Sequence, residues 1–99
     1  MNSQKDILKS LALHMDEMEK SFSVTRIGLF GSFVHNKANA KSDIDIITQL
    51  NEPTFDHYMD LKFYLEKLFD RSVDLVLADT IKPRLAPIVE QEAIYAQRL

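Results

Sequence analysis

Apolar residues recur at helical spacing near the start of the chain. Leu8, Leu11, Met15 and Met18 lie three or four positions apart, and charged residues fill the positions between them. The residues at 3–6, Ser-Gln-Lys-Asp, resemble a capping box with Asp in place of Glu. The pattern therefore predicts a helix over about 4–20.

Three short segments instead have the composition of strands. Residues 24–30 are rich in β-branched and aromatic side chains and end at Gly31. A second predicted strand covers about 43–49, with Ile44, Ile46 and Ile47, and a third covers 73–77. Three strands form a small sheet.

Helical patterns separate these strands. A short helix is predicted over 32–38, with a polar loop over 36–42. A longer helix follows the turn at 51–54 and continues to about 69, and residues 70–71 form a turn. Pro83 and Pro87 are predicted to open a last helix that runs to the end of the chain. Its apolar side would consist of Leu85, Ile88, Val89 and Tyr95. The order αβαβαβα is typical of an α/β domain, with helices packed on a small sheet.

Length and composition limit the possible functions. A chain of 99 residues is one domain, 1–99, and any active site in it should be shallow or completed by another chain. The absence of cysteine excludes a disulfide framework and a thiolate zinc site. With no membrane-spanning run and no apolar signal-peptide stretch, a cytoplasmic location and no membrane partner are expected. A net charge of -3 argues against general nucleic-acid binding but permits a single bound nucleotide.

The candidate chemistry lies at the ends of the predicted strands. Gly31 permits close approach of backbone to a ligand, and Ser32 lies where a helix start favours an anion. Asp43 and Asp45, two residues apart on a strand, project from one face. Carboxylates this close repel unless a cation such as Mg²⁺ lies between them. Asp74 interrupts an apolar strand and would lie beside them if the third strand neighbours the second.

The pattern Gly31-Ser32, ten residues, then Asp43-x-Asp45 resembles the signature of the minimal nucleotidyltransferases of the polymerase-beta superfamily. The resemblance extends to 29–30, Ser42, 73–76 and 81–85, and covers roughly residues 24–98. It implies a three-stranded mixed sheet flanked by helices, with ATP as substrate and Mg²⁺, two ions, as cofactor. Asp43 and Asp45 would bind both metals. Asp74 would bind the metal that activates the acceptor hydroxyl.

The same resemblance implies further roles and partners. Gly31, Ser32 and Ser42 would bind the nucleotide, although a helix cap and a turn are the ordinary interpretations of the two serines. Family members occur beside HEPN-domain toxins as antitoxins, and some transfer AMP onto a tyrosine of the toxin. An antitoxin adenylyltransferase, in a homo- or hetero-oligomer, is thus the leading hypothesis.

Two other hypotheses remain open. Many members follow Gly-Ser with Arg-x-Arg-Gly, whereas this chain has Phe-Val-His-Asn at 33–36. The missing arginines favour a binding module that neutralises its partner by contact alone. In a working nucleotide site, His35, Lys37 and Lys41 would partly substitute for the arginines as phosphate contacts. A nucleotidyltransferase acting on small molecules is disfavoured, because such enzymes usually add a second domain.

The face that carries the three aspartates is also expected to carry Ile47 and Val76. If no helix covers them, these two residues form an apolar patch beside the site. The patch predicts that a partner, or a second copy, docks there.

Overall fold

The described part of the chain folds around one mixed sheet. The computed structural model describes residues 3–31 and 43–97. Its strands have the order β3-β2-β1-β4, in which β1 is antiparallel to β2 and β4, and β2 is parallel to β3. The strands are β1 (Val24–Leu29), β2 (Ile44–Leu50), β3 (Val73–Leu77) and β4 (Ile94–Tyr95). The helices are α1 (Gln4–Leu13), α2 (Met15–Phe22), α3 (Phe55–Phe69) and α4 (Ala86–Glu92), with the 3-10 turn η2 (Ala78–Thr80).

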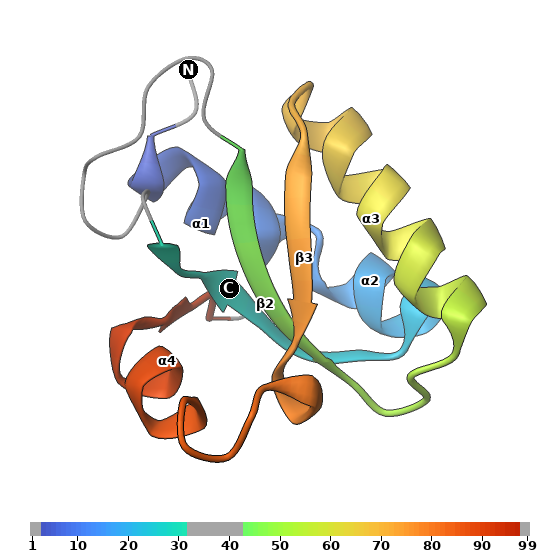
Figure 1. The fold of residues 1–99 in the computed structure, drawn as a ribbon. Helices are drawn as coiled ribbons and strands as arrows, with labels where there is room; N and C mark the ends of the chain where they lie inside the picture. The colour runs from blue at the N-terminus through green and yellow to red at the C-terminus, as the bar shows by residue number, and fades with distance from the viewer. Residues whose placement is uncertain (1–2, 32–42, 98–99) are drawn as a thin grey trace.

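The two faces of the sheet have different coverings. Helices α1, α2 and α3 lie behind the sheet in Figure 1, while α4 lies in front of it, near β1 and β4. The core fills the space between the sheet and the three helices behind it, and its fully buried members include Ile7, Leu11, Met18, Ile27, Leu29, Ile44, Ile46, Leu61 and Leu65. The opposite face, which carries Asp45 and Asp74, is called the open face below.

The first predicted helix is two helices. A break at His14 separates α1 from α2, and His14 has φ -101° and ψ 9° instead of helical values. Its ring Nδ1 lies 2.7 Å from the Ser10 carbonyl oxygen, which also accepts the His14 backbone N–H. A side chain that occupies a carbonyl of the preceding turn is a recognised cause of a helix bend. The apolar spacing continues through the break, so the periodicity did not reveal it.

Helix α3 connects the parallel strands β2 and β3 and covers the free edge of β3. It begins after Thr54, whose hydroxyl accepts the His57 N–H, so the helix follows the predicted turn at 51–54. The Tyr58 hydroxyl donates to the Leu75 carbonyl at 2.6 Å, and Glu66 accepts the Val73 N–H at 3.1 Å. Two outward backbone groups of an edge strand are therefore satisfied by side chains of this helix.

The end of the chain differs from the prediction. The last helix is only seven residues long and is followed by β4, so the sheet has four strands and not the three expected. Tyr95 pairs with Gly28 of β1, where an added Cβ would lie 2.7 Å from the Tyr95 Cα. A glycine in β1 thus lets the returning chain approach closely. Ile88 and Leu85, expected in the core, are 54% and 44% exposed.

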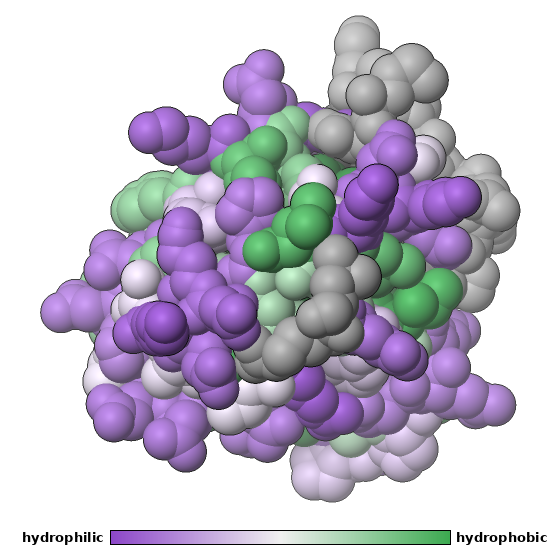
Figure 2. Space-filling view, turned by 180° about the vertical axis from the view of Figure 1, so that it is seen from behind, coloured by the Kyte–Doolittle hydropathy of each residue, from purple (hydrophilic) through white to green (hydrophobic). Residues whose placement is uncertain are grey.

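The outer surface of the helical layer is mainly hydrophilic. In Figure 2, which views the molecule from behind, apolar residues form small separate groups among hydrophilic ones. No helix within residues 3–31 and 43–97 has the length and hydrophobicity that a membrane crossing requires.

Candidate functional site

The pairing of β2 with β3 brings two of the predicted aspartates together. Asp45 and Asp74 are direct partners in the parallel register. Neighbouring strands are about 4.8 Å apart, and paired residues project to the same face. Asp45 is half-buried and Asp74 is exposed. The expectation that Asp74 lies beside Asp45 is therefore met by the geometry, although the two residues are far apart in the sequence.

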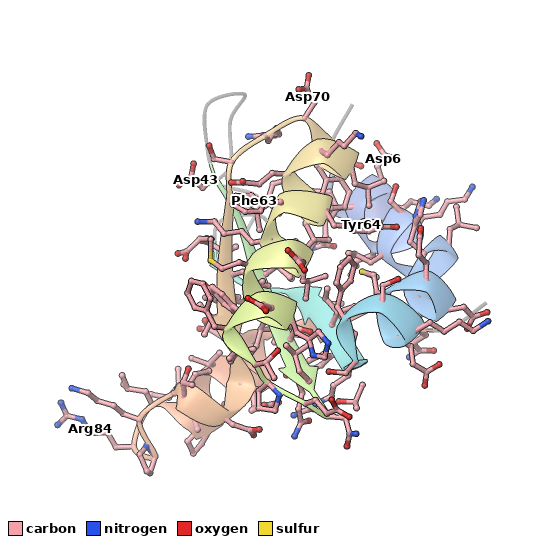
Figure 3. The ribbon with its side chains drawn as sticks, turned by 90° about the vertical axis from the view of Figure 1, so that its right-hand side faces the viewer. Asp6, Asp43, Phe63, Tyr64, Asp70 and Arg84 are labelled. Carbon is pink, nitrogen blue, oxygen red and sulfur yellow. The ribbon has the colours of Figure 1, made fainter. Side chains whose placement is uncertain are left out.

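Asp43 lies at the edge of the same group. It is exposed and directly precedes β2, and the next residue, Ile44, donates its N–H to the Ser72 carbonyl at 3.0 Å. This bond holds the start of β2 against the start of β3. Figure 3 places Asp43 near the end of the molecule that also carries Asp70. No hydrogen bond or ion pair is recorded for Asp43 or Asp74 with any other described residue.

Gly31 adopts a conformation that suits the site. Its φ is +74°, a value that side-chain-bearing residues rarely adopt, and an added Cβ would lie 3.0 Å from the Asp45 Cγ. The neighbouring Phe30 N–H donates to the Asp45 carbonyl at 3.1 Å, which holds the two segments together. Gly31 thus brings backbone against the Asp45 carboxylate at a place where a methyl group would collide.

These carboxylates have the chemistry of a magnesium site. Within residues 3–31 and 43–97, no three His, Asp or Glu side chains are close enough together to enclose a metal ion. Mg²⁺, however, is usually bound by one or two carboxylates together with substrate phosphates. Asp45 and Asp74, side by side on one face, match that smaller donor set. Ser32 and Ser42, the predicted nucleotide ligands, lie outside the described residues, as do His35, Lys37 and Lys41.

A polar network covers the other end of the open face. Arg26 forms an ion pair with Glu90 of α4 at 3.0 Å, and its guanidinium lies 4.4 Å from the centre of the Tyr95 ring. The Tyr95 hydroxyl donates to Glu90 at 3.0 Å, and Arg26 also donates to Gln49 of β2. Burial, together with the bond to Glu90, raises the pKa of Tyr95 to about 12. This network holds α4 and β4 against the sheet.

The structure changes the prediction for the apolar patch. Ile47 is fully buried within the chain, so it offers no surface to a partner. Val76 is half-buried and lies beside a groove at the β3 edge. The predicted patch on the open face is therefore wrong for Ile47. Arg84, in the segment before α4, projects at the opposite end of the molecule from Asp43 (Figure 3) and does not contribute to the carboxylate group.

The network around Arg26 was not found from the sequence. Its residues come from β1, β2, α4 and β4, and no spacing rule connects them. Gly28 could have indicated that another segment packs closely against this strand, because a glycine inside a strand marks a close backbone approach. The short segment 93–96 has no pattern of its own that would identify a strand.

The mixed sheet with paired aspartates is the architecture of a nucleotidyltransferase. The model of the nucleotidyltransferase domain family matches residues 8–96, and this chain belongs to that family. The protein adenylyltransferase MntA of Thermococcus cleftensis is 35% identical over 96 residues, covering 96% of this chain and 97% of the relative. The predictions of this family and of a nucleotidyltransferase enzyme are therefore confirmed.

Solved structures support the same fold. A structure assigned as a minimal nucleotidyltransferase has a TM-score of 0.72 and 30% identity, covering 88% of this chain and 93% of its own. A complex of a tri-AMPylated HEPN toxin with an MNT antitoxin from Shewanella oneidensis contains a chain with a TM-score of 0.68. It is 20% identical, and the match covers 97% of this chain and 73% of that chain. The second match shows the fold alone.

Proposed function

We propose that this protein is a Mg²⁺-dependent adenylyltransferase that transfers AMP from ATP to a tyrosine hydroxyl of a HEPN-domain toxin, and so acts as its antitoxin. The observation that carries the proposal is the register of β2 and β3, which pairs Asp45 with Asp74 on the open face. Relatives named protein adenylyltransferase over nearly the whole chain support the reaction type. The partner is carried over, as part of this proposal, from the resemblance to MNT antitoxins, whose complex with a HEPN toxin contains a chain of the same fold. A cytoplasmic location belongs to the same proposal.

The proposed site residues have two kinds of role: they bind the metal and the triphosphate, and one of them accepts a proton. Asp45 and Asp74 would hold Mg²⁺ together with the substrate phosphates, and Asp43 would be a further ligand at the edge of this pair. When bound, the metal would neutralise charge on the attacking and leaving oxygens. Gly31, Ser32 and Ser42 would position the triphosphate. The acceptor hydroxyl oxygen forms a bond to the α-phosphorus as the bond to pyrophosphate breaks. The hydroxyl proton passes to the Asp74 carboxylate, which is exposed on the open face and can meet an incoming side chain.

A protein acceptor suits the shape of the site. Among the described elements, α4 and η2 lie near the ends of β2 and β3 and not near their first residues, and no other described helix lies on the open face (Figure 1). The described elements alone do not enclose a small acceptor over Asp45 and Asp74, and this arrangement would admit a tyrosine presented by another protein. The third hypothesis, modification of a small molecule, is less well supported for this reason.

The proposal is tested by transfer of labelled AMP. The wild-type protein, ATP labelled at the α-phosphate and Mg²⁺ are incubated with the purified product of the adjacent gene. Transfer is expected for the wild type and for the control Asp6→Asn, an exposed aspartate on α1. Loss of transfer is expected for Asp45→Asn and Asp74→Asn, with unchanged circular dichroism. Wild-type transfer that continues in excess chelator contradicts the metal mechanism.

A second candidate function is neutralisation by contact alone. The observation that favours it is Phe-Val-His-Asn at 33–36 in place of the arginines common in the family, since bidentate phosphate contacts are lost with them. The two functions are separated by the Asp43→Ala protein. If that variant still protects cells from the toxin, binding alone is sufficient. If protection is lost while the complex still forms, catalysis is required.

A further inference from the structure

An apolar ridge runs along the outer surface of α3. We define it as Phe55, Met59 and Phe63, which are four residues apart and therefore share one side of the helix. Phe55 is 75% exposed and Phe63 is 58% exposed, and no other described large apolar side chain except Leu13 is as exposed as these two. Figure 3 shows Phe63 on the side of α3 toward Asp43, whereas Tyr64 points to α2. The core does not use these side chains.

A groove lies between this ridge and the edge of β3. Its volume is about 390 Å³, and its lining includes Pro53, Phe55, Tyr58, Leu75, Val76 and Leu77. Val76 lies two residues after Asp74 on the same strand, so the groove approaches the carboxylates along β3. The outward backbone groups of Val73 and Leu75 already bond to Glu66 and Tyr58. Addition of a partner strand at this edge is therefore disfavoured, and docking through side chains is favoured.

The segment that carries the ridge has a net negative charge. Residues 52–80, which form α3, β3 and η2, contain seven Asp or Glu and three Lys or Arg. The other residues contain eight acidic and nine basic side chains, so this segment carries more than the whole net charge of -3. Asp56, Asp60 and Asp70 are exposed on α3 or at its end. An apolar ridge with an acidic rim is complementary to an apolar segment that carries Lys and Arg.

We propose that the ridge and the groove dock a basic amphipathic segment of the acceptor protein, which places the acceptor hydroxyl above Asp74. This inference rests on the proposed function and deepens it by assigning the surface that selects the partner. A second copy of the chain is the less suitable occupant, because self-docking would place two acidic surfaces together. Aromatic side chains at the centre of such a patch commonly carry most of the binding energy.

The test compares a variant that lacks the ridge with a control variant that lacks an exposed apolar side chain elsewhere on the surface. Phe55→Ser/Phe63→Ser removes the ridge, and Leu13→Ser removes an equally exposed apolar side chain (60%) on α1. Affinity for the purified product of the adjacent gene is measured by titration calorimetry, and AMP transfer is measured over a range of acceptor concentrations. The ridge variant is expected to lose at least ~10-fold in affinity and to raise KM for the acceptor equally, with kcat retained. The affinity of the ridge variant for ATP is expected to stay at the wild-type value. Leu13→Ser is expected to keep the wild-type affinity and KM for the acceptor.

Two further measurements complete the test. Asp60→Lys should weaken binding and flatten its dependence on salt, because it replaces a negative charge beside the ridge with a positive one. A photo-crosslinking amino acid at position 63 should capture the acceptor, and one at position 13 should not. Wild-type affinity in the ridge variant overturns the inference while the proposed function stands. Capture of a second copy at position 63 overturns it in favour of self-association. Absence of wild-type binding and transfer overturns the proposed function and this inference together.

Discussion

Replacing Gly31 by alanine is expected to damage the site far more than the fold. The backbone at Gly31 has φ +74°, and a residue with a side chain in this region costs about 1–2 kcal/mol. For a domain of this size, that lowers the midpoint of thermal unfolding by about 4–15 °C. The new methyl group would also meet the Asp45 carboxyl group, with only 3.0 Å to its Cγ. That carboxylate must therefore retreat on the order of 1 Å, and a displacement of this size costs about 100-fold in rate.

The assay is AMP transfer to the acceptor at saturating ATP and Mg²⁺, well below the melting temperature of the variant. Gly28→Ala is the control, because its methyl group would meet the backbone of Ile94 and Tyr95 and not a carboxylate. It is expected to destabilise the attachment of β4 and to lose less of its transfer rate than Gly31→Ala. Wild-type transfer by Gly31→Ala, with an unchanged unfolding midpoint, would refute the assigned geometry.

Three other changes test the packing and the polar networks. Leu65→Ala, which removes a fully buried side chain of α3, should lower the free energy of unfolding by about 2–5 kcal/mol in urea titrations. Tyr58→Phe, which removes the donor to Leu75 at the β3 edge, should cost about 1 kcal/mol in the same titrations; no change would exclude a role for this bond. The folded state raises the pKa of Tyr95 from 10.0 to about 12, so the stability associated with its neutral phenol is intact below pH 10 and lost as pH rises toward 12. Tyr95→Phe should therefore show a shallower loss of stability over this range than the wild type, and an equal loss would contradict the assignment.

Much of the fold was predictable because its signals are local. The strands at 24–30, 43–49 and 73–77 were expected within one residue of β1, β2 and β3, since β-branched runs bounded by turn residues mark strands reliably. The break at His14 was missed because apolar spacing records which face is buried and not whether the backbone is continuous. The two-residue strand β4 was missed because its pairing partner lies some 65 positions away.

The candidate site, like the fold, was predictable from the sequence only in part. The i, i+2 spacing predicted that Asp43 and Asp45 share one face of a strand, but Asp43 lies just before β2, and the pairing of Asp74 with Asp45 depended on strand order. The sequence analysis stated that order only as a condition, because the residues themselves do not specify which strands are neighbours. The burial of Ile47 was likewise beyond prediction, because it depends on which segment returns across the open face.

The parallel pairing of β2 with β3 affects when, during folding, Asp45 and Asp74 come together. Parallel neighbours need a crossover, and here the whole of α3 must dock before β3 can reach β2. Asp45 belongs to a strand that pairs early with a nearby antiparallel neighbour, while Asp74 arrives only after this slower, non-local step. The paired carboxylates therefore depend on a non-local pairing step, and they do not exist in a chain in which β3 has not yet reached β2. A partly folded chain would carry Asp45 without Asp74 beside it, so the carboxylate pair proposed to bind the metal exists only once β3 has paired with β2.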